Sequence, residues 1–452
     1  MFNRLLLNKL NDWSKKSNRK PLVIRGARQV GKTTLVLMFG EKFDQFIELN
    51  LEKAEDRNVF EKSDNISEIV KAIFFLKNKS LSKSRTLIFI DEIQNSVKAI
   101  KMLRYFFEEY KQFYIIAAGS LLETILNFNE SFPVGRVEFL YLYPCSFTEF
   151  LMANEQTGII EAANEISFPQ QLHDKTLKLF SEYALIGGMP EVIKSYINDK
   201  DVTNLKSIYE SLLISYMDDV EKYSKNNVQA SVIHHIIRNC FQDAGKRIKY
   251  EGFGNTNYKY REIKEALVLL ERAMLIRILY PTFSVKPPVT HSLRKSPKLM
   301  VLDTGLINYF SGIQKEFFVK ELLEDVYEGR ISEHIAGQEL FSISPSQIHQ
   351  PTFWVREKKQ SSAEIDYVIQ YEDLIIPVEV KYGKAGTLKS LMQFIDMAPH
   401  HYAVRVYTGM LSVEEFKTIA GKKFFLLNLP FYLVGNIFGY IAWLIKLHPN
   451  KK

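Results

Sequence analysis

The chain has 452 residues, of which 46% are hydrophobic and 25% charged, a balance that excludes a disordered or low-complexity protein. This length predicts two to four domains rather than one core. The formal net charge of +7 favours weak association with polyanions but specifies no function. Cys145 and Cys240 offer neither a disulfide framework nor zinc spacing, so we expect a reducing, cytoplasmic compartment.

The N-terminus, MFNRLLLNKLNDWSKK, has charges scattered through it, so we expect no secretory signal. Leu5, Leu6, Leu10 and Trp13 recur at helical spacing. This spacing predicts a helix that packs on the body of the protein.

Residues 21–39, PLVIRGARQVGKTTLVLMF, place a glycine-bracketed loop between an apolar run and a helix. This is the G-x-x-x-x-G-K-[ST] pattern, in which backbone N–H groups surround phosphate oxygens. We expect Lys32 to bridge the terminal phosphates of ATP and Thr33 to offer its hydroxyl to Mg²⁺. The predicted nucleotide-binding residues are Gly26, Ala27, Arg28, Gln29, Val30, Gly31, Lys32, Thr33 and Thr34.

The apolar run RTLIFIDEIQ, residues 85–94, predicts a central parallel strand that is buried on both faces. It ends in Asp91 and Glu92, at the edge where α/β sheets bind ligands. Asp91 is predicted to hold Mg²⁺ and Glu92 to polarise the attacking water, although a helix N-cap is a compatible second role. A third run, FYIIAAGS, ends in Ser120, which is predicted to help orient the same water.

Five segments together resemble the AAA-plus-type ATPases of the archaeal-ATPase group: GARQVGKTT, IFIDEIQ, IIAAGS, GRVEFLYLYPCSFTEFL and YALIGGMPEV. The resemblance implies a nucleotide site made by Lys32, Thr33, Asp91 and Glu92, with Ser120 in the sensor position. It also implies that Arg136 is an arginine finger or a sensor. A finger that acts in trans would require a homo-oligomer. The alternative for Arg136 is a turn with a solvated charge.

Residues 151–224 read as helices with polar joints, and their acidic segment SYMDDVEKY is expected to be a solvated face without chemistry. From residue 225 a helix, a basic stretch, a second helix and a strand resemble a winged helix. Such modules either contact DNA or pack between domains, and both alternatives stay open. The residues available for phosphate contacts are Lys246, Arg247, Lys249, Lys259 and Arg261.

The segment EIDYVIQYEDLIIPVEVKYG, residues 364–383, predicts two strands joined by a polar turn. Because side chains alternate along a strand, Glu379 and Lys381 share a face and Asp366 approaches Glu379. This order of residues resembles the PD-(D/E)xK nucleases. The resemblance adds Glu333 on the preceding helix and Gln393 on the following one.

Asp366 and Glu379, with Glu333, are predicted to bind a divalent metal ion, and Lys381 to position or deprotonate a water for phosphodiester attack. The alternative is a charge-neutral cluster with an exposed Glu379–Lys381 salt bridge. Three carboxylates that converge without a cation would repel one another, which favours metal binding. A nuclease-like fold does not by itself establish cleavage.

No residue from Phe424 to Ile445 is charged, a length that could cross a bilayer. Polar and helix-breaking residues interrupt it, so we expect a break near 428–430 that separates a buried strand from a short packed helix. A membrane-tethered ATPase remains an alternative.

These segments predict an α/β protein with a P-loop NTPase parallel sheet, a helical lid, a winged-helix-like module and a C-terminal α/β restriction-endonuclease-like domain. The expected boundaries are 1–150, 151–224, 225–310 and 311–452. The predicted function is an ATPase that uses ATP and Mg²⁺ and couples nucleotide state to a nuclease-like, DNA-binding domain. The alternative is a regulatory or scaffolding ATPase whose C-terminal domain only binds DNA or protein.

Overall fold

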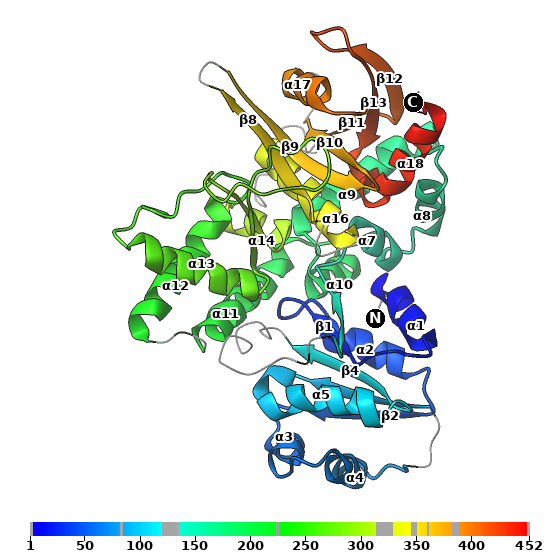
Figure 1. The fold of residues 1–452 in the computed structure, drawn as a ribbon, viewed down its shortest axis with the longest axis vertical. Helices are drawn as coiled ribbons and strands as arrows, with labels where there is room; N and C mark the ends of the chain where they lie inside the picture. Colours follow the sequence, from blue (N-terminus) through cyan, green and yellow to red (C-terminus); the bar gives the residue numbers. More distant parts are fainter. Residues whose placement is uncertain are drawn as a thin grey trace. The chain divides into compact units, whose positions relative to one another are not determined.

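The computed structural model describes residues 3–81, 85–119, 133, 135–222, 224, 226–312, 329–344, 350–358, 361–381 and 388–449. The chain divides into two compact units (Figure 1). The first holds Met1–Tyr143, Ile214–Lys225 and Val268–Leu275, and the second holds Pro144–Leu213, Asn226–Leu267 and Ile276–Lys452. The predicted boundary near residue 150 lies close to this division. The predicted lid, winged-helix-like and C-terminal segments, however, do not form separate units, because most of their residues share the second one.

The first unit contains a sheet of five parallel strands in the order β2-β3-β4-β1-β5. The strands are β1 Leu22–Arg25, β2 Gln45–Asn50, β3 Thr86–Asp91, β4 Tyr114–Gly119 and β5 Glu138–Tyr141. Every residue of β3 is buried, which confirms the prediction for this run. The sheet is that of a P-loop NTPase, and the carboxyl ends of β1, β3 and β4 lie along one edge.

Helices cover both faces of this sheet. They are α1 Leu6–Lys15, α2 Lys32–Gly40, α3 Ala54–Glu61, α4 Ile66–Leu76 and α5 Val97–Glu109. The apolar side chains of α3, α4 and α5 form one core with β2, β3 and β4, while α1 and α2 lie on the other side (Figure 1). In α1, Leu6, Leu10 and Trp13 are buried, as predicted, but Leu5 is exposed.

The helices of the middle of the chain begin after Tyr143. They are α7 Phe147–Ala153, α8 Thr157–Asn164, α9 His173–Ile186, α10 Pro190–Asp199, α11 Lys206–Glu221, α12 Asn227–Gln242 and α13 Tyr260–Arg272. After α13, β6 Ile276–Leu279 pairs with β7 Lys298–Val301 in an antiparallel ribbon, and α14 Thr304–Phe310 follows. The helix, basic stretch, helix and strand predicted between residues 225 and 285 are therefore present.

A six-stranded mixed sheet in the order β12-β13-β11-β10-β9-β8 dominates the C-terminal part of the second unit (Figure 1). Its strands are β8 Thr352–Lys358, β9 Ser361–Tyr371, β10 Leu374–Val380, β11 Tyr402–Tyr407, β12 Ser412–Lys417 and β13 Lys423–Pro430. The accompanying helices are α16 Gly329–Ile343, α17 Lys389–Met397 and α18 Ile437–Leu447. Strands β9 and β10 form the predicted hairpin, with Tyr371 opposite Leu374.

The uncharged tail is part of this sheet and its cover. It contributes β13, a short 3₁₀ segment Phe431–Asn436, and α18, so the predicted break at residues 428–430 is confirmed. Among the described residues, no helix has both the length and the apolarity needed to cross a bilayer.

A buried polar network explains why the predicted lid and the C-terminal segment share one unit. Glu339 of α16 accepts hydrogen bonds from the Phe147 backbone N–H (3.0 Å) and from the Tyr183 hydroxyl (2.7 Å). Burial raises the pKa of the Glu339 carboxyl to about 7. The folded protein therefore keeps a proton that an unfolded chain releases near pH 4.5.

We expect Glu339→Gln to flatten the pH dependence of stability. The stabilisation from this protonated carboxyl is complete below about pH 4.5 and is lost as the pH rises through about 7, so the wild type weakens over this range. Thermal unfolding midpoints between pH 5 and 8 would measure the effect, with the exposed Glu165→Gln as the matched control. An unchanged slope in Glu339→Gln would contradict the assignment.

Candidate nucleotide and metal sites

The loop between β1 and α2 has the backbone of a phosphate-binding loop. Gly31, which precedes α2, has φ +94°, a left-handed conformation that glycine adopts without steric cost. A side chain on Gly26 would lie 2.5 Å from the Leu142 carbonyl oxygen, so the chain after β5 packs directly on the loop. Arg4 donates to the Val30 carbonyl oxygen (2.8 Å) and to the Tyr143 carbonyl oxygen (2.7 Å), which fixes the loop from outside.

Three predicted side chains meet at the carboxyl edge of the sheet. Thr33 donates its hydroxyl hydrogen to Asp91 Oδ2 at 2.7 Å. The Lys32 ammonium is buried and donates to the carbonyl oxygens of Gly26 (3.0 Å) and Ala27 (2.8 Å). The structure therefore brings together Lys32, Thr33 and Asp91, as the loop motif and the strand end predicted.

Glu92 is held in an unusual backbone conformation. Its φ of +51° and ψ of +43° lie in the left-handed region, which is uncommon for a residue other than glycine. Gln94 donates from its side-chain amide to Glu92 Oε2, which fixes the carboxylate. Such strain is common at functional sites. Gln94 was quoted in the IFIDEIQ segment but was not predicted to act.

Burial shifts the pKa values of all three ionisable groups in this site. It lowers the pKa of the Lys32 ammonium, against the raising effect of Glu92 and Asp91. It raises the pKa of Asp91 against the Thr33 hydrogen bond, and that of Glu92 against the Gln94 hydrogen bond. Ionisable groups that lie close together and whose pKa values are shifted by burial are typical of functional sites.

These residues fit a magnesium-bound nucleoside triphosphate. Within the described part of the chain the Lys32 ammonium donates to backbone carbonyl oxygens, and its hydrogen bonds can shift to phosphate oxygens, which accept them more strongly. The Thr33 hydroxyl and the Asp91 carboxylate supply the oxygen ligands that Mg²⁺ prefers. In the rest of the predicted loop Ala27 and Val30 are buried, whereas Gln29 and Thr34 are exposed.

The acidic segment of α11 is not the solvated face that the sequence predicted. Asp219 is only 9% exposed and accepts a hydrogen bond from Arg28 of the loop at 2.9 Å. The Tyr216 hydroxyl donates to the Arg28 carbonyl oxygen (3.3 Å), and the Gln29 side-chain amide donates to the Ser215 hydroxyl (3.4 Å). One face of α11 therefore orders the loop, a contact between residues about 190 positions apart that local patterns cannot reveal.

We expect Asp219→Ala to raise the Kd for ATP by about fivefold, since the loop would then have to be ordered at binding, at a cost of roughly 1 kcal/mol. Titration with a fluorescent ATP analogue would measure it. The adjacent Asp218→Ala is the matched control, because Asp218 is exposed. Unchanged or tighter binding in Asp219→Ala would rule out this role.

Arg136 does not lie near the loop of its own chain. It precedes β5, at the amino edge of the sheet, and forms an ion pair with Glu108 at 3.0 Å. A sensor role for Arg136 at the nucleotide site of the same chain is therefore wrong, because that site is at the opposite edge. A role in trans stays a prediction. Ser120 lies outside the described residues, directly after Gly119 at the end of β4.

The hairpin β9–β10 assembles the second predicted site. Asp366 Oδ2 accepts a hydrogen bond from the Val380 backbone N–H at 2.8 Å, so the carboxylate reaches across to β10. Glu379 Oε1 lies 2.6 Å from the Lys381 ammonium, which confirms that the two side chains share a face. The Glu379 side chain is 7% exposed and that of Lys381 is 30% exposed, so the carboxylate is buried while the ammonium is partly in contact with solvent.

A lysine that the sequence analysis missed lies among these acids. Lys298, the first residue of β7, is 4% exposed and approaches Glu333 Oε1 at 2.6 Å and Glu364 Oε1 at 2.7 Å. Glu333 is thus close to the site, but its partner is an ammonium. Nothing in the local pattern of residues 298–301 distinguishes this lysine from a surface lysine at a strand end.

Burial raises the pKa of every predicted acid in this site. The pKa of Glu333 rises to about 8, against the lowering effect of Lys298, and that of Glu379 rises to about 7, with Asp366 adding to the rise. Burial also raises the pKa of Asp366. For Lys298, burial lowers the pKa, but Glu333, Asp366 and Glu364 together outweigh it and the net shift is upward.

A divalent metal ion fits part of this set. Glu379 Oε2 is buried and has no hydrogen-bond partner among the described residues, the state expected of an oxygen that awaits a cation. Against this, the described part of the chain contains no group of three or more His, Cys, Asp or Glu side chains arranged to hold a metal. The predicted ligand set of Glu333, Asp366 and Glu379 is therefore not assembled, because Lys298 occupies the position beside Glu333.

The structure gives other predicted residues different partners. Gln393 of α17 accepts a hydrogen bond from Arg356 of β8 at 3.1 Å. Among the basic residues of the winged-helix-like segment, Lys246 pairs with Asp243 (2.9 Å) and Arg261 with Glu265 (2.9 Å). Arg247 lies 3.7 Å from Glu364, close to the acidic site.

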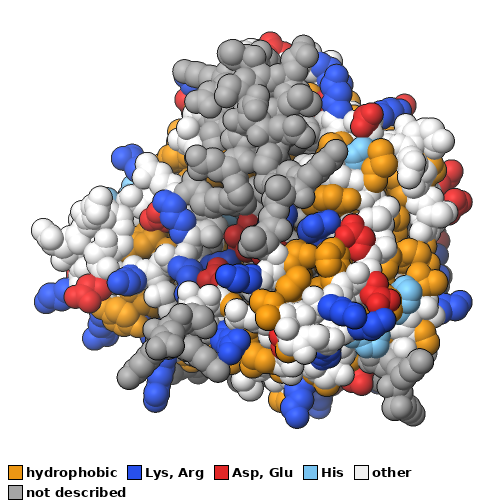
Figure 2. Space-filling model, turned by 90° about the horizontal axis from the view of Figure 1, so that it is seen from above, with side chains coloured by type: hydrophobic (Ala, Val, Ile, Leu, Met, Phe, Trp, Pro, Cys, Tyr) orange, Lys and Arg blue, Asp and Glu red, His pale blue; other side chains and the backbone are white. Residues whose placement is uncertain are grey.

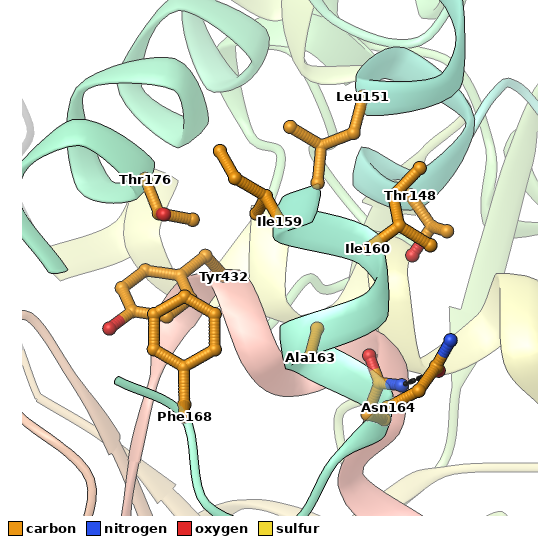
Figure 3. Close-up of a pocket in the computed structure, with 10 residues that line it drawn as sticks. Thr148, Leu151, Ile159, Ile160, Ala163, Asn164, Phe168, Thr176 and Tyr432 are labelled. Carbon is orange, nitrogen blue, oxygen red and sulfur yellow. Dashed lines mark hydrogen bonds between the residues drawn. The ribbon is translucent and has the colours of Figure 1, made fainter. Parts of the chain in front are cut away.

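A separate small pocket lies between α7, α8 and the 3₁₀ segment after β13 (Figure 3). Its walls are Thr148, Leu151, Ile159, Ile160, Ala163, Asn164, Phe168, Thr176, Tyr432 and Asn436. Asn436 closes one end by donating to Asn164 at 2.9 Å. No charged side chain lines the pocket, so we assign it no catalytic role.

Three family models match consecutive parts of the chain. Residues 18–151 match an AAA domain. Residues 177–316 and 328–431 match two domains of unknown function, DUF8612 and DUF4143. No curated protein matches the sequence. The nuclease-like resemblance of the C-terminal part is therefore neither supported nor contradicted by a family of known activity.

The solved structures that match this chain are distant from it in sequence. A Walker-type ATPase of Pyrococcus abyssi is 13% identical, with 69% of this chain and 96% of that chain covered and a TM-score of 0.45. The Orc1 protein of Aeropyrum pernix in complex with DNA is 13% identical (70% and 92% covered, TM-score 0.29). The RuvB Holliday junction branch migration motor of Thermotoga maritima is 12% identical (65% and 93% covered, TM-score 0.28).

Since all three TM-scores are below 0.5, the assignment rests on the family model and on the geometry of the loop. The parallel sheet, the loop from Gly26 to Lys32 and the Thr33–Asp91 contact all lie within the matched region. Residues 18–151 match the AAA domain model, and their parallel sheet and glycine loop agree with a P-loop NTPase fold.

Proposed function

We propose that this protein hydrolyses ATP and couples nucleotide state to a C-terminal nuclease-like domain that acts on DNA. The observation that carries the C-terminal part is the β9–β10 hairpin, which holds Asp366, Glu379 and Lys381 together. One buried oxygen of this group, Glu379 Oε2, has no hydrogen-bond partner among the residues that the structure describes. The match of residues 18–151 to an AAA domain supports the ATPase part.

In the ATPase site, Lys32 and the loop amides would hold the phosphates, while Glu92 would accept a proton from the attacking water. In the C-terminal site, Asp366 and Glu379 would hold a divalent ion, which when bound supplies Lewis-acid polarisation of a phosphoryl oxygen. Lys381, fixed by Glu379 at 2.6 Å, would orient a water or the scissile phosphate.

The charge of the protein is compatible with a nucleic-acid partner, but its distribution is mixed. On the face in Figure 2, basic side chains alternate with acidic and hydrophobic ones rather than forming one patch. Lys249 and Lys259 are exposed and remain the best candidates for phosphate contacts in a winged-helix-like module. Cys145 and Cys240 are buried and form no disulfide, in keeping with the cytoplasmic location that we infer.

The decisive experiment is a cleavage assay on plasmid and single-stranded DNA with Mg²⁺ or Mn²⁺, with and without ATP. We expect the wild type to cut and Asp366→Asn to lose at least about 100-fold in rate, because it loses a metal ligand. Asp373→Asn, an exposed acid in the turn of the same hairpin, is the matched control and should cut normally. A clean wild type that is inert on DNA and RNA would rule out the nuclease.

A second candidate function is a regulatory or scaffolding ATPase whose C-terminal domain binds DNA or protein without cutting. Lys298 favours it, because its ammonium already neutralises two of the acids. DNA binding that persists in the presence of EDTA, together with ATP hydrolysis and no cleavage, would support this candidate.

A further inference from the structure

The ammonium of Lys298 joins acids from two elements far apart in the sequence. Glu333 comes from α16 and Glu364 from β9, and the ammonium lies 2.6 Å and 2.7 Å from their Oε1 atoms. It also lies over the ring of Phe353 of β8, 4.9 Å from the ring centroid. A lysine that is 4% exposed and has two carboxylate partners is a built part of the site.

The backbone of Lys298 is paired on both sides, which fixes the position from which its side chain extends. Lys298 pairs with Leu279 of β6, and it forms an isolated bridge with Arg247. The next residue, Leu299, donates its N–H to the Lys246 carbonyl oxygen at 2.9 Å and accepts from Gly245 at 2.7 Å. Strand β7 therefore places Lys298 beside acids of α16 and β9, which come later in the chain.

The other two acids of the site, Glu379 and Asp366, have different partners. Glu379 uses Oε1 for Lys381, while its buried Oε2 has no partner in the described part of the chain. Asp366 receives a backbone N–H, and it has no ion pair among the described residues. Glu333 and Glu364 therefore contact an ammonium directly. Asp366 and the Oε2 atom of Glu379 have no such contact among the described residues, although Glu379 Oε1 holds Lys381.

We propose that Lys298 is a positioning residue that acts as an internal counter-ion: it withdraws Glu333 and Glu364 from metal binding and limits this site to one divalent ion at Asp366 and Glu379. This inference rests on the proposed metal-dependent function of the C-terminal domain. A neutral residue in place of Lys298 would remove the ammonium that Glu333 and Glu364 share and leave Arg247, 3.7 Å from Glu364, as the nearby cation. Two such carboxylates repel unless a second metal ion joins them.

The test is the number of Mn²⁺ ions bound by the full chain without nucleotide, measured by calorimetry and by electron paramagnetic resonance. Asp366→Asn gives the baseline for ions bound elsewhere. We expect one ion above this baseline in the wild type and two in Lys298→Met, which keeps the length of the side chain. The exposed Lys286→Met is the matched control and should bind one.

The double variant Lys298→Met/Glu333→Gln removes the ammonium and one of its acids together, so it keeps the local charge balanced and should return to one ion. It also provides a test if Lys298→Met does not fold, as judged by circular dichroism. One ion in a folded Lys298→Met, or two in the double variant, would overturn the inference about Lys298 alone. No ion above the baseline in the wild type would instead overturn the proposed metal-dependent function.

Discussion

Lys32→Ala is expected to slow ATP hydrolysis by about 100-fold or more, the size of effect seen when one preorganised group that stabilises transition-state charge is removed. The buried ammonium of Lys32 lies at the start of α2 and donates to two carbonyl oxygens, from which it can turn to phosphate oxygens. Phosphate release by the purified chain measures the rate. Lys42→Ala, an exposed lysine just after α2, is the matched control.

Glu92→Gln separates binding from chemistry in the same assay. The amide keeps the shape of the side chain but cannot accept the proton of the attacking water, so ATP binding should persist while hydrolysis is lost. If Lys32→Ala hydrolyses ATP at the wild-type rate, or if Glu92→Gln does, the nucleotide site has been placed wrongly.

The second large effect is expected for Gly187→Ala, which should destabilise the second unit by roughly 3–5 kcal/mol. Gly187 has φ +75°, and an added Cβ would lie 2.1 Å from Asp303 Oδ1 and 2.5 Å from the Gly305 nitrogen. Asp303 is fully buried and accepts a hydrogen bond from the Gly188 N–H at 2.5 Å, so it cannot move aside without losing it.

Gly252→Ala is the control that separates the clash from the backbone cost. Gly252 has nearly the same φ, +71°, but apart from its chain neighbours no atom of the described residues lies within 4 Å of an added Cβ, so this variant should lose only about 1 kcal/mol. Urea unfolding followed by intrinsic fluorescence measures both. Equal losses in the two variants would show that the contact between Gly187 and Asp303 is not tight.

The parts of the fold that the sequence predicted correctly depend on local patterns. The loop motif lies between a strand and a helix in a short stretch, so Lys32 and Thr33 could be placed from their neighbours alone. The period of two in residues 364–383 likewise predicted that Glu379 and Lys381 share a face. In each case the residues that define the feature are close in the chain.

The features that the sequence did not predict, or predicted wrongly, depend on contacts between residues that are far apart in the sequence. Asp219 looked like one acid of a solvated helix until Arg28, 191 positions away, was seen to pair with it. Lys298 looked like an ordinary strand-end lysine, yet its partners are 35 and 66 positions further along the chain. Arg136 belongs to a motif-like Gly-Arg pair, but the parallel pairing of β5 with β1 places it at the amino edge of the sheet, opposite the loop.

The origin of Lys298 bears on how this protein can be dissected. The lysine belongs to residues 177–316, whereas Glu333, Glu364, Asp366 and Glu379 all belong to residues 328–431, the next matched region. A fragment limited to residues 328–431 would contain these acids but would lack Lys298, the ammonium that pairs with Glu333 and Glu364. The smallest piece suitable for study in isolation must therefore begin ahead of β7.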